Sequence, residues 1–169
     1  MEPAATAAAI ILGAAIALAG VVWAEVHRER VAHRREIRDR RIADVRAFHA
    51  ELAALAFGFR TALMLSWNLE GLDAPSNIDR DIGQHLASAR FYAIHLRDDG
   101  LESALEDYRA TSAALSINRM KDRSALLAMT ADERNAAYFA SDDDDRQSAA
   151  YARAEGRVRE LLEIIDPLK

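Results

Sequence analysis

The chain has 169 residues, of which 51% are hydrophobic and 29% charged, with a formal net charge of -5 and no cysteine. This length fits one domain of ordinary size and is too short for a two-domain enzyme. The lack of cysteine excludes disulfides, cysteine-ligated zinc and thiol nucleophiles. Of the 22 basic residues 20 are arginine, a composition typical of a bacterial or phage sequence with GC-rich codons.

Charge is distributed unevenly along the chain. Residues 4–24 carry none, residues 26–46 hold eight arginines against four acids, and residues 47–169 hold 14 basic against 21 acidic residues. The local net charges are therefore +4 and -7 for the last two segments. We predict a transmembrane anchor over residues 1–25, an arginine-rich juxtamembrane helix over 26–46 (the neck), and a helical bundle over 47–169.

The uncharged run from Ala4 to Ala24 is long enough to cross a membrane as a helix. Its 21 residues span about 32 Å at about 1.5 Å per residue, which matches the thickness of a bilayer's hydrocarbon core. Trp23 stands at the far end of the run, where an indole favours the headgroup zone. We therefore expect the lipid bilayer to be the first partner of this chain.

A retained anchor competes with a cleaved signal peptide as the interpretation of this run. A signal peptide starts with a basic stretch, and only Met1 and Glu2 precede Pro3. The triplet from Ala17 to Ala19 resembles a cleavage site, as triplets in any alanine-rich helix do. We favour the retained anchor.

The basic residues follow the apolar run, which predicts a single-pass protein of the cell membrane with its N-terminus outside and its bundle in the cytoplasm. Ala9, Gly13 and Ala17 have the small-residue spacing that lets two membrane helices approach closely, although such a helix equally often stays alone.

The neck contains no glycine or proline and is expected to continue the membrane helix, with arginines pointing around most of its circumference. Its predicted partners are anionic lipid headgroups, contacted through Arg28 to Arg46 at about 1 kcal/mol per basic residue near the surface. We expect no nucleic-acid partner, because no aromatic residue is interleaved with these arginines and the remainder is acidic.

Beyond the neck, apolar residues recur at steps of three and four, the period of an amphipathic helix. The first stripe ends near Trp67, with Gly71 and Pro75 closing the helix and Ser76 capping the next. The first two stripes consist of Ile42, Val45, His49, Leu52, Ala56, Phe59 and Leu63, and of Ile78, Ile82, Leu86, Ala89, Ala93 and Leu96.

A third helix carries Leu101, Leu105, Tyr108, Ser112 and Leu115, and we expect a kink or break in it before Thr130. Thr130 and Glu133 form a capping-box pattern for a short helix. A last helix follows Ser141, with an apolar stripe from Tyr151 to Ile165, and Pro167 stops it.

The fold prediction is therefore all-α: an N-terminal single transmembrane helix that continues into a cytoplasmic antiparallel bundle of four to five helices.

Motifs for chemistry are missing from the sequence. The seven glycines stand apart, so neither a P-loop nor a dinucleotide-binding loop is present. No two histidines are three or four residues apart, and a Glu-x-x-His motif is also missing. We predict no catalytic residue, no cofactor and no metal.

One cluster remains open, because His49, Asp81 and His85 lie on or beside apolar stripes and could meet across the bundle. We favour histidines hydrogen-bonded in or near the core over a metal site.

The run Asp142–Asp145 does not fit a calcium loop, because Gln147 stands where glycine is needed and Arg153 where glutamate is needed. It fits a helix start that Ser141 caps, with acids in the first turn. Trp67, at a helix end, is either buried or part of a partner surface.

These observations predict a non-enzymatic interaction or scaffold module held at the inner membrane face. It would bind another protein, or itself, through heptad-like faces such as Ile42 to Leu63 or Tyr151 to Ile165. One alternative is a membrane-tethered metal-binding protein or enzyme that uses His49, Asp81 and His85. Another is a small membrane-active factor of a phage or toxin type, although the large acidic bundle argues against a pore.

Overall fold

The computed structural model describes the backbone of residues 2–68 and 77–166, and side chains from residue 17 on, except those of residues 68 and 119–121. Within these ranges the chain is all-helical, without a strand, which confirms the predicted all-α class. The six helices are α1 (Glu2–Asn68), α2 (Asn77–Leu96), α3 (Asp99–Lys121), α4 (Arg123–Leu127), α5 (Ala131–Ala140) and α6 (Asp143–Ile165).

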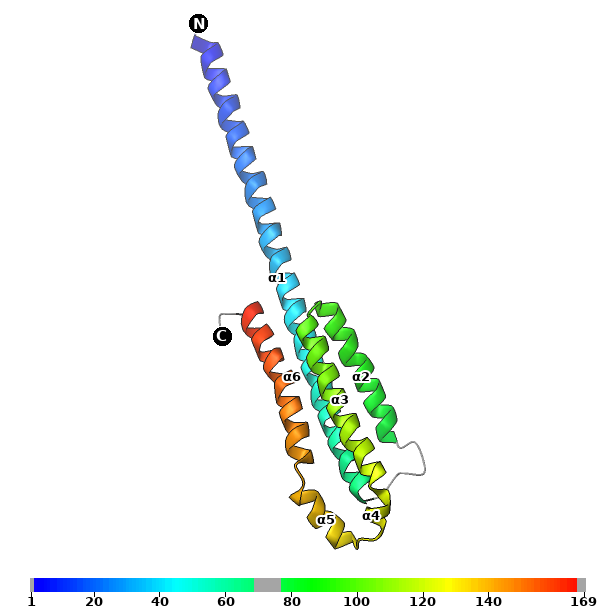
Figure 1. Ribbon diagram of the computed structural model, residues 1–169. Coiled ribbons are helices and arrows are strands. Elements are labelled where there is room, and N and C mark those ends of the chain that lie inside the picture. The colour runs from blue at the N-terminus through cyan, green and yellow to red at the C-terminus, as the bar shows by residue number, and fades with distance from the viewer. Residues whose placement is uncertain (1, 69–76, 167–169) are drawn as a thin grey trace. The chain divides into compact units, whose positions relative to one another are not determined.

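The chain forms two compact units, Met1–Arg40 and Arg41–Lys169. In the first unit the described backbone is a single helix, the N-terminal part of α1. In the second unit, hereafter the bundle, the remainder of α1 lies with α2, α3 and α6, and successive long helices run in opposite directions (Figure 1). The short helices α4 and α5 join α3 to α6 at one end.

The predicted apolar stripes form the core of the bundle. All five predicted residues of the third helix, from Leu101 to Leu115, are buried on α3. The main cluster joins Leu101, Leu105 and Tyr108 to α1, α2 and α6 through Val45, Phe48, Leu52, Leu55, Ala89, Ala93, Leu96, Ala150, Ala154 and Val158. Each fully buried large apolar side chain stabilises the fold by roughly 1.5–3 kcal/mol relative to an exposed one.

A smaller apolar cluster closes the end that α4 and α5 cover. It consists of Leu63, Trp67, Leu115 and Leu126, with Ala137 and Tyr138 packed against it. The rings of Trp67 and Tyr138 meet edge to face, with their centroids 5.9 Å apart. Trp67 is therefore part of the core, at 4% exposure, and the partner-surface interpretation of this residue is wrong.

The helix boundaries follow local chemistry. The predicted break before Thr130 is confirmed, since α3 ends at Lys121 and the five-residue α4 follows. The capping box of α5 is also confirmed: the Glu133 N–H donates to Thr130 Oγ1 at 3.3 Å, and the Thr130 N–H donates to Glu133 Oε2 at 2.7 Å. The Thr130 N–H, and then the Thr130 hydroxyl at 2.9 Å, donate to the Glu133 carboxylate and hold the pKa of Glu133 below its ordinary value.

Three local features shape the turn between α2 and α3. Arg97 has φ 53, a left-handed conformation that ends α2. Asp98 Oδ1 accepts the Leu101 N–H at 2.8 Å and caps α3. Gly100 leaves room for Arg157, because an added Cβ would lie 2.6 Å from Arg157 Nε.

The predicted turn between the first two bundle helices, with Gly71, Pro75 and Ser76, lies outside the described residues, as does Pro167. On the described side of that turn, α2 begins at Asn77 with Asp79 in its first turn.

Candidate functional site

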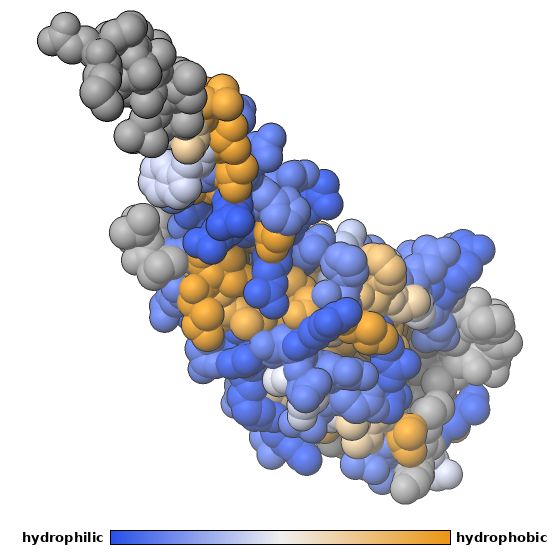
Figure 2. Space-filling view, turned by 90° about the horizontal axis from the view of Figure 1, so that it is seen from above, coloured by the Kyte–Doolittle hydropathy of each residue, from blue (hydrophilic) through white to orange (hydrophobic). Residues whose placement is uncertain are grey.

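The first unit presents large apolar side chains with high exposure. The exposed fractions, from 39% to 70%, belong to Leu18, Val21, Val22, Trp23 and Val26. Figure 2 shows apolar surface as an orange band beside the grey residues of the N-terminus. Burying this surface is favourable, and the described side chains of the chain do not bury it.

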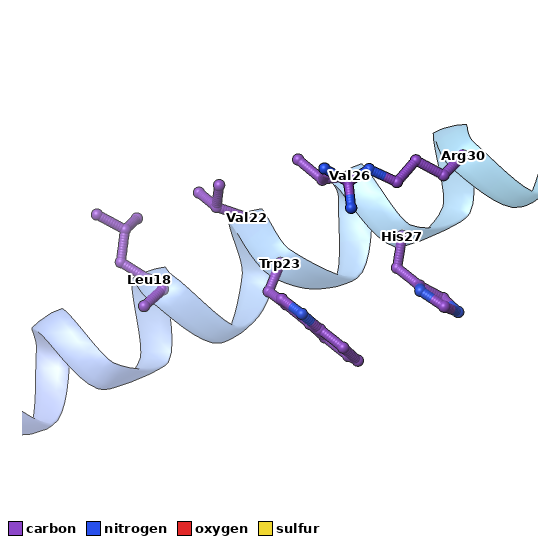
Figure 3. Close-up of a pocket in the computed structure, with 7 residues that line it drawn as sticks. Leu18, Val22, Trp23, Val26, His27 and Arg30 are labelled. Atoms are coloured by element: carbon purple, nitrogen blue, oxygen red, sulfur yellow. The ribbon is translucent and has the colours of Figure 1, made fainter.

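These side chains surround the helix rather than line one stripe. Leu18, Val22 and Val26 project to one side, while Trp23 and His27 project to the other (Figure 3). The Trp23 and His27 rings stack, with centroids 5.3 Å apart and an interplanar angle of 13°. The hollow along this surface is lined by one helix from Leu18 to Arg30, and without an opposite wall it is an exposed face rather than a cavity.

By length and composition, α1 is long and apolar enough to cross a membrane, over the described stretch Ala17–Trp67. Part of this apolar character has another cause, because Leu52, Leu55 and Leu63 are fully buried in the bundle. The candidate membrane segment is therefore the N-terminal portion of the stretch, where the apolar side chains are exposed. The earlier part of the predicted run, Ala4 to Ile16, has no described side chains.

The basic residues of the neck lie on several sides of the helix, and four of them form a continuous row. His27, Arg30, Arg34 and Arg38 follow one another at steps of three, four and four, so they share one face. The acids Glu25 and Glu36 lie away from that face. They pair with Arg28 at 3.5 Å and with Arg40 at 2.6 Å. The first unit thus carries a row of basic residues on one face directly after its apolar turns, with Arg28, Arg35 and Arg40 on other sides of the helix.

The predicted cluster of His49, Asp81 and His85 is not brought together. His49 Nε2 faces Glu155 Oε1 of α6 at 3.8 Å, whereas His85 Nδ1 lies 2.7 Å from Glu51 Oε2 of α1. Both histidines are half-buried and face a carboxylate on another helix. Among the residues with described side chains, no three histidine or acidic groups are placed to hold a metal ion.

Asp81 and His85 instead line an apolar groove between α1 and α2. The cavity has a volume of about 240 Å³ and is lined by Ala54, Phe57, Gly58, Thr61, Ile78, Asp81, Ile82 and His85. At its floor the two helices meet closely, since a Cβ added to Gly58 would lie 2.8 Å from Ile82 Cγ1. Glycine at position 58 thus permits the approach that shapes this α1–α2 groove.

The rim of the groove is aromatic and polar. Phe57 stands on the α1 side with 78% of its surface exposed. Asp81 is exposed on the α2 side, and His85 with its partner Glu51 marks one end. An apolar floor with polar groups at its edge is typical of sites that bind a side chain or helix of a partner.

The predicted helix start at the aspartate run is confirmed, because α6 begins at Asp143 with three acids in its first turn. The predicted cap differs in detail: Asp142 is the N-cap residue, and Ser141 Oγ accepts the Asp143 N–H at 3.4 Å. The sequence did not reveal that Asp143 is 1% exposed and accepts the Trp67 indole N–H at 3.3 Å.

A second buried polar contact lies one turn further along α6. Gln147 Nε2 donates to Ser112 Oγ of α3 at 3.1 Å, and both residues are buried. Burial raises the pKa of the nearby Tyr108 hydroxyl, which stays neutral. These groups are satisfied within the bundle, and they fix the pairing of its helices rather than form an open site.

No protein-family model, no curated protein and no solved structure matches the chain. Two features of the described residues remain as indications of function: an exposed apolar helix segment followed by basic residues, and a groove between α1 and α2 of the bundle.

Proposed function

We propose that the chain is a single-pass membrane protein whose bundle is a non-enzymatic interaction module at the inner membrane face. The observation that carries this proposal is the exposure of Leu18, Val21, Val22 and Trp23, which find a favourable environment in lipid. The uncharged run of 21 residues supplies the required length.

The position of the basic residues supports the proposed orientation. The eight arginines of the neck come after the apolar run, and an excess of arginine and lysine stays on the cytoplasmic side of a membrane helix. The N-terminus would then lie outside and the bundle in the cytoplasm.

Anionic lipid headgroups are the proposed partners of the first turns of the neck. His27, Arg28 and Arg30 follow the apolar turns most closely, and all three side chains are exposed. Each basic residue near an anionic surface contributes about 1 kcal/mol, and this contribution fades within a Debye length of about 8 Å.

We place the proposed interaction surface of the bundle outside its predicted heptad faces. The stripes Ile42 to Leu63 and Tyr151 to Ile165 supply Val45, Leu52 and Val158 to the core, so these faces are occupied within one chain. The α1–α2 groove, with its exposed Phe57, is the apolar hollow best placed to receive a protein partner.

The anchor is tested by placing charge in it. Arginine near the centre of a membrane helix costs about 2.5–3.5 kcal/mol, so Gly13→Arg with Leu18→Arg should move the full-length protein from the membrane to the soluble fraction. The matched control is Val31→Arg with Ile37→Arg, which adds the same two charges to the neck and should leave the protein in the membrane. Equal behaviour of the two variants would refute the anchor.

Orientation and processing are tested on the same protein. Because the chain has no cysteine and Ser148 is exposed on α6, Ser148→Cys supplies a single accessible thiol. Protection from a membrane-impermeant thiol reagent until lysis is expected, and labelling of intact cells would place the bundle outside. If the mass of the purified protein corresponds to a chain that begins at Gly20, the signal-peptide alternative is established.

The metal or enzyme alternative stays a prediction, which is less favoured because His49 and His85 face different carboxylates, those of Glu155 and Glu51. The membrane-active alternative stays a prediction, and loss of membrane potential on expression would support it.

A further inference from the structure

We propose that a second copy of the chain occupies the α1–α2 groove, with Phe57 of each copy inserted into the groove of the other. The inference rests on the proposed membrane anchor for the concentration of the two copies. The inference concerns the bundle, which lies outside the proposed anchor.

The groove and the side chain that would fill it belong to one surface patch. A twofold dimer uses the same patch on both subunits, so the patch must carry both a projection and a hollow. Phe57 projects with 78% of its surface exposed, and the cavity of about 240 Å³ lies beside it. Small-molecule pockets are usually about 300–1,000 Å³, so this smaller cavity suits a side chain.

The helix directions place the matching residues at one level. Gly58 lies against Ile82, and α1 and α2 run in opposite directions. Residues just after Gly58 on α1 are therefore level with residues just before Ile82 on α2. Two parallel copies related by a twofold axis along α1 then bring Phe57 of one copy to the floor of the other copy's groove.

Charges at the rim agree with this pairing. Arg60 stands almost one turn after Phe57, with 65% of its side chain exposed beside its partner Asp144. Asp81 is exposed on the groove wall, level with Arg60. Insertion of Phe57 would therefore bring Arg60 of one copy near Asp81 of the other, twice per dimer, with opposite charges facing.

The patch is small, and the anchor compensates for this. Stable interfaces between free proteins bury about 800 Å² per partner, more than one aromatic side chain and a groove provide. Two chains confined to one membrane meet at an effective concentration that can reach the millimolar range, where a weak, specific contact suffices.

The experiment uses the full-length protein in its membrane with Thr61→Cys, the only thiol of the chain, beside the groove. A short bismaleimide should give a cross-linked dimer. Adding Phe57→Glu should lower the yield by about tenfold or more, because a charge would enter the apolar floor. Phe139→Glu is the matched control: Phe139 is 83% exposed on α5, and the yield should not change. Circular dichroism should show equal helicity in all variants.

Exchanging the charges at positions 60 and 81 distinguishes the proposed contact at the groove from other contacts between two copies. Asp81→Arg should weaken cross-linking, and Asp81→Arg with Arg60→Glu should restore it, because each copy then again offers opposite charges. If neither Phe57→Glu nor Asp81→Arg lowers the cross-linking yield, the proposal is overturned, and the two copies meet through their membrane helices instead. The proposal is also overturned if the Thr61→Cys protein without further substitutions gives no cross-linked dimer.

Failure of the anchor is recognised separately. If the Thr61→Cys protein is found in the soluble fraction, the anchor is refuted and sedimentation at raised concentration tests the groove. A dimer of the wild type that Phe57→Glu abolishes and Phe139→Glu preserves supports the groove, and a monomer at every concentration overturns it.

Discussion

The first unit and the bundle use apolar residues in opposite ways, although both contain part of α1. In the first unit Leu18 and Trp23 are about 70% exposed, whereas in the bundle Phe48 and Leu52 on the same helix are fully buried. Apolar side chains surround the helix in the first case and follow steps of three and four in the second. Hydropathy alone does not separate a lipid-facing helix from a core helix, but the arrangement around the axis does.

The largest expected difference between the two regions concerns stability. Leu52→Ala should lower the free energy of unfolding of the bundle by about 2–5 kcal/mol, because it leaves a cavity in the core. Leu18→Ala should leave this free energy unchanged. Urea unfolding of the full-length protein in mild detergent measures both effects, with Trp67 as the reporter in a Trp23→Phe background. A similar loss in both variants would contradict the separation into two units.

The buried carboxylate of Asp143 should produce the next largest effect. Asp143→Ala removes the hydrogen bond from the Trp67 indole N–H to a buried carboxylate, and hydrogen bonds to charged groups contribute about 1.5–3 kcal/mol. We expect a lower urea midpoint and a changed Trp67 emission. Asp145→Ala is the control, because Asp145 belongs to the same acidic first turn but is exposed. Equal losses would mean that the acids act only through the helix dipole.

The sequence reveals which faces of the helices are buried, because the helical period is local. Leu101, Leu105 and Tyr108 share a side of α3 wherever that helix packs, and the capping box at Thr130 needs only residues within four positions. The break after α3 is equally local, since the clean period ends there.

Pairings between helices do not follow from local patterns. Trp67 and Asp143 are 76 positions apart, and a run of four aspartates is ordinarily solvated. The α1–α2 groove likewise depends on Gly58 lying opposite Ile82, and that pairing is set by the packing of whole helices. For the same reason His49 of α1 faces Glu155 of α6, whereas His85 of α2 faces Glu51 of α1.

Acid should weaken the bundle through ion pairs that hold the pKa of a carboxyl group low. Arg157 donates to Asp98 Oδ2 at 2.7 Å, and this bond, opposed by burial, lowers the pKa of Asp98 below its ordinary 3.8. Arg109 and Arg90 lower the pKa of Glu106 from 4.5 to about 2. A carboxyl whose pKa is lower in the folded state contributes stability above its ordinary pKa and loses it as the pH falls through the folded value.

Arg157→Gln should therefore cost about 1 kcal/mol at pH 7, where the charged hydrogen bonds to Asp98 are formed. The difference from the wild type should shrink as the pH falls below Asp98's ordinary pKa of 3.8, because protonated Asp98 gains little from the guanidinium in either protein. Urea midpoints measured from pH 7 to pH 3 test this. A difference that is independent of pH would show that Arg157 acts by packing alone.

The smallest expected effect is an increase in the free energy of unfolding of the bundle. Arg97 holds φ 53 at the end of α2, a conformation that costs a residue with a Cβ about 1 kcal/mol or more and glycine almost nothing. Arg97→Gly should therefore stabilise the bundle by about 0.5–1 kcal/mol, after the larger chain entropy of glycine in the unfolded state is subtracted. Arg97→Ala keeps the strained backbone and should give no gain. If both substitutions change the urea midpoint equally, the Arg97 side chain rather than the backbone sets the cost of this turn.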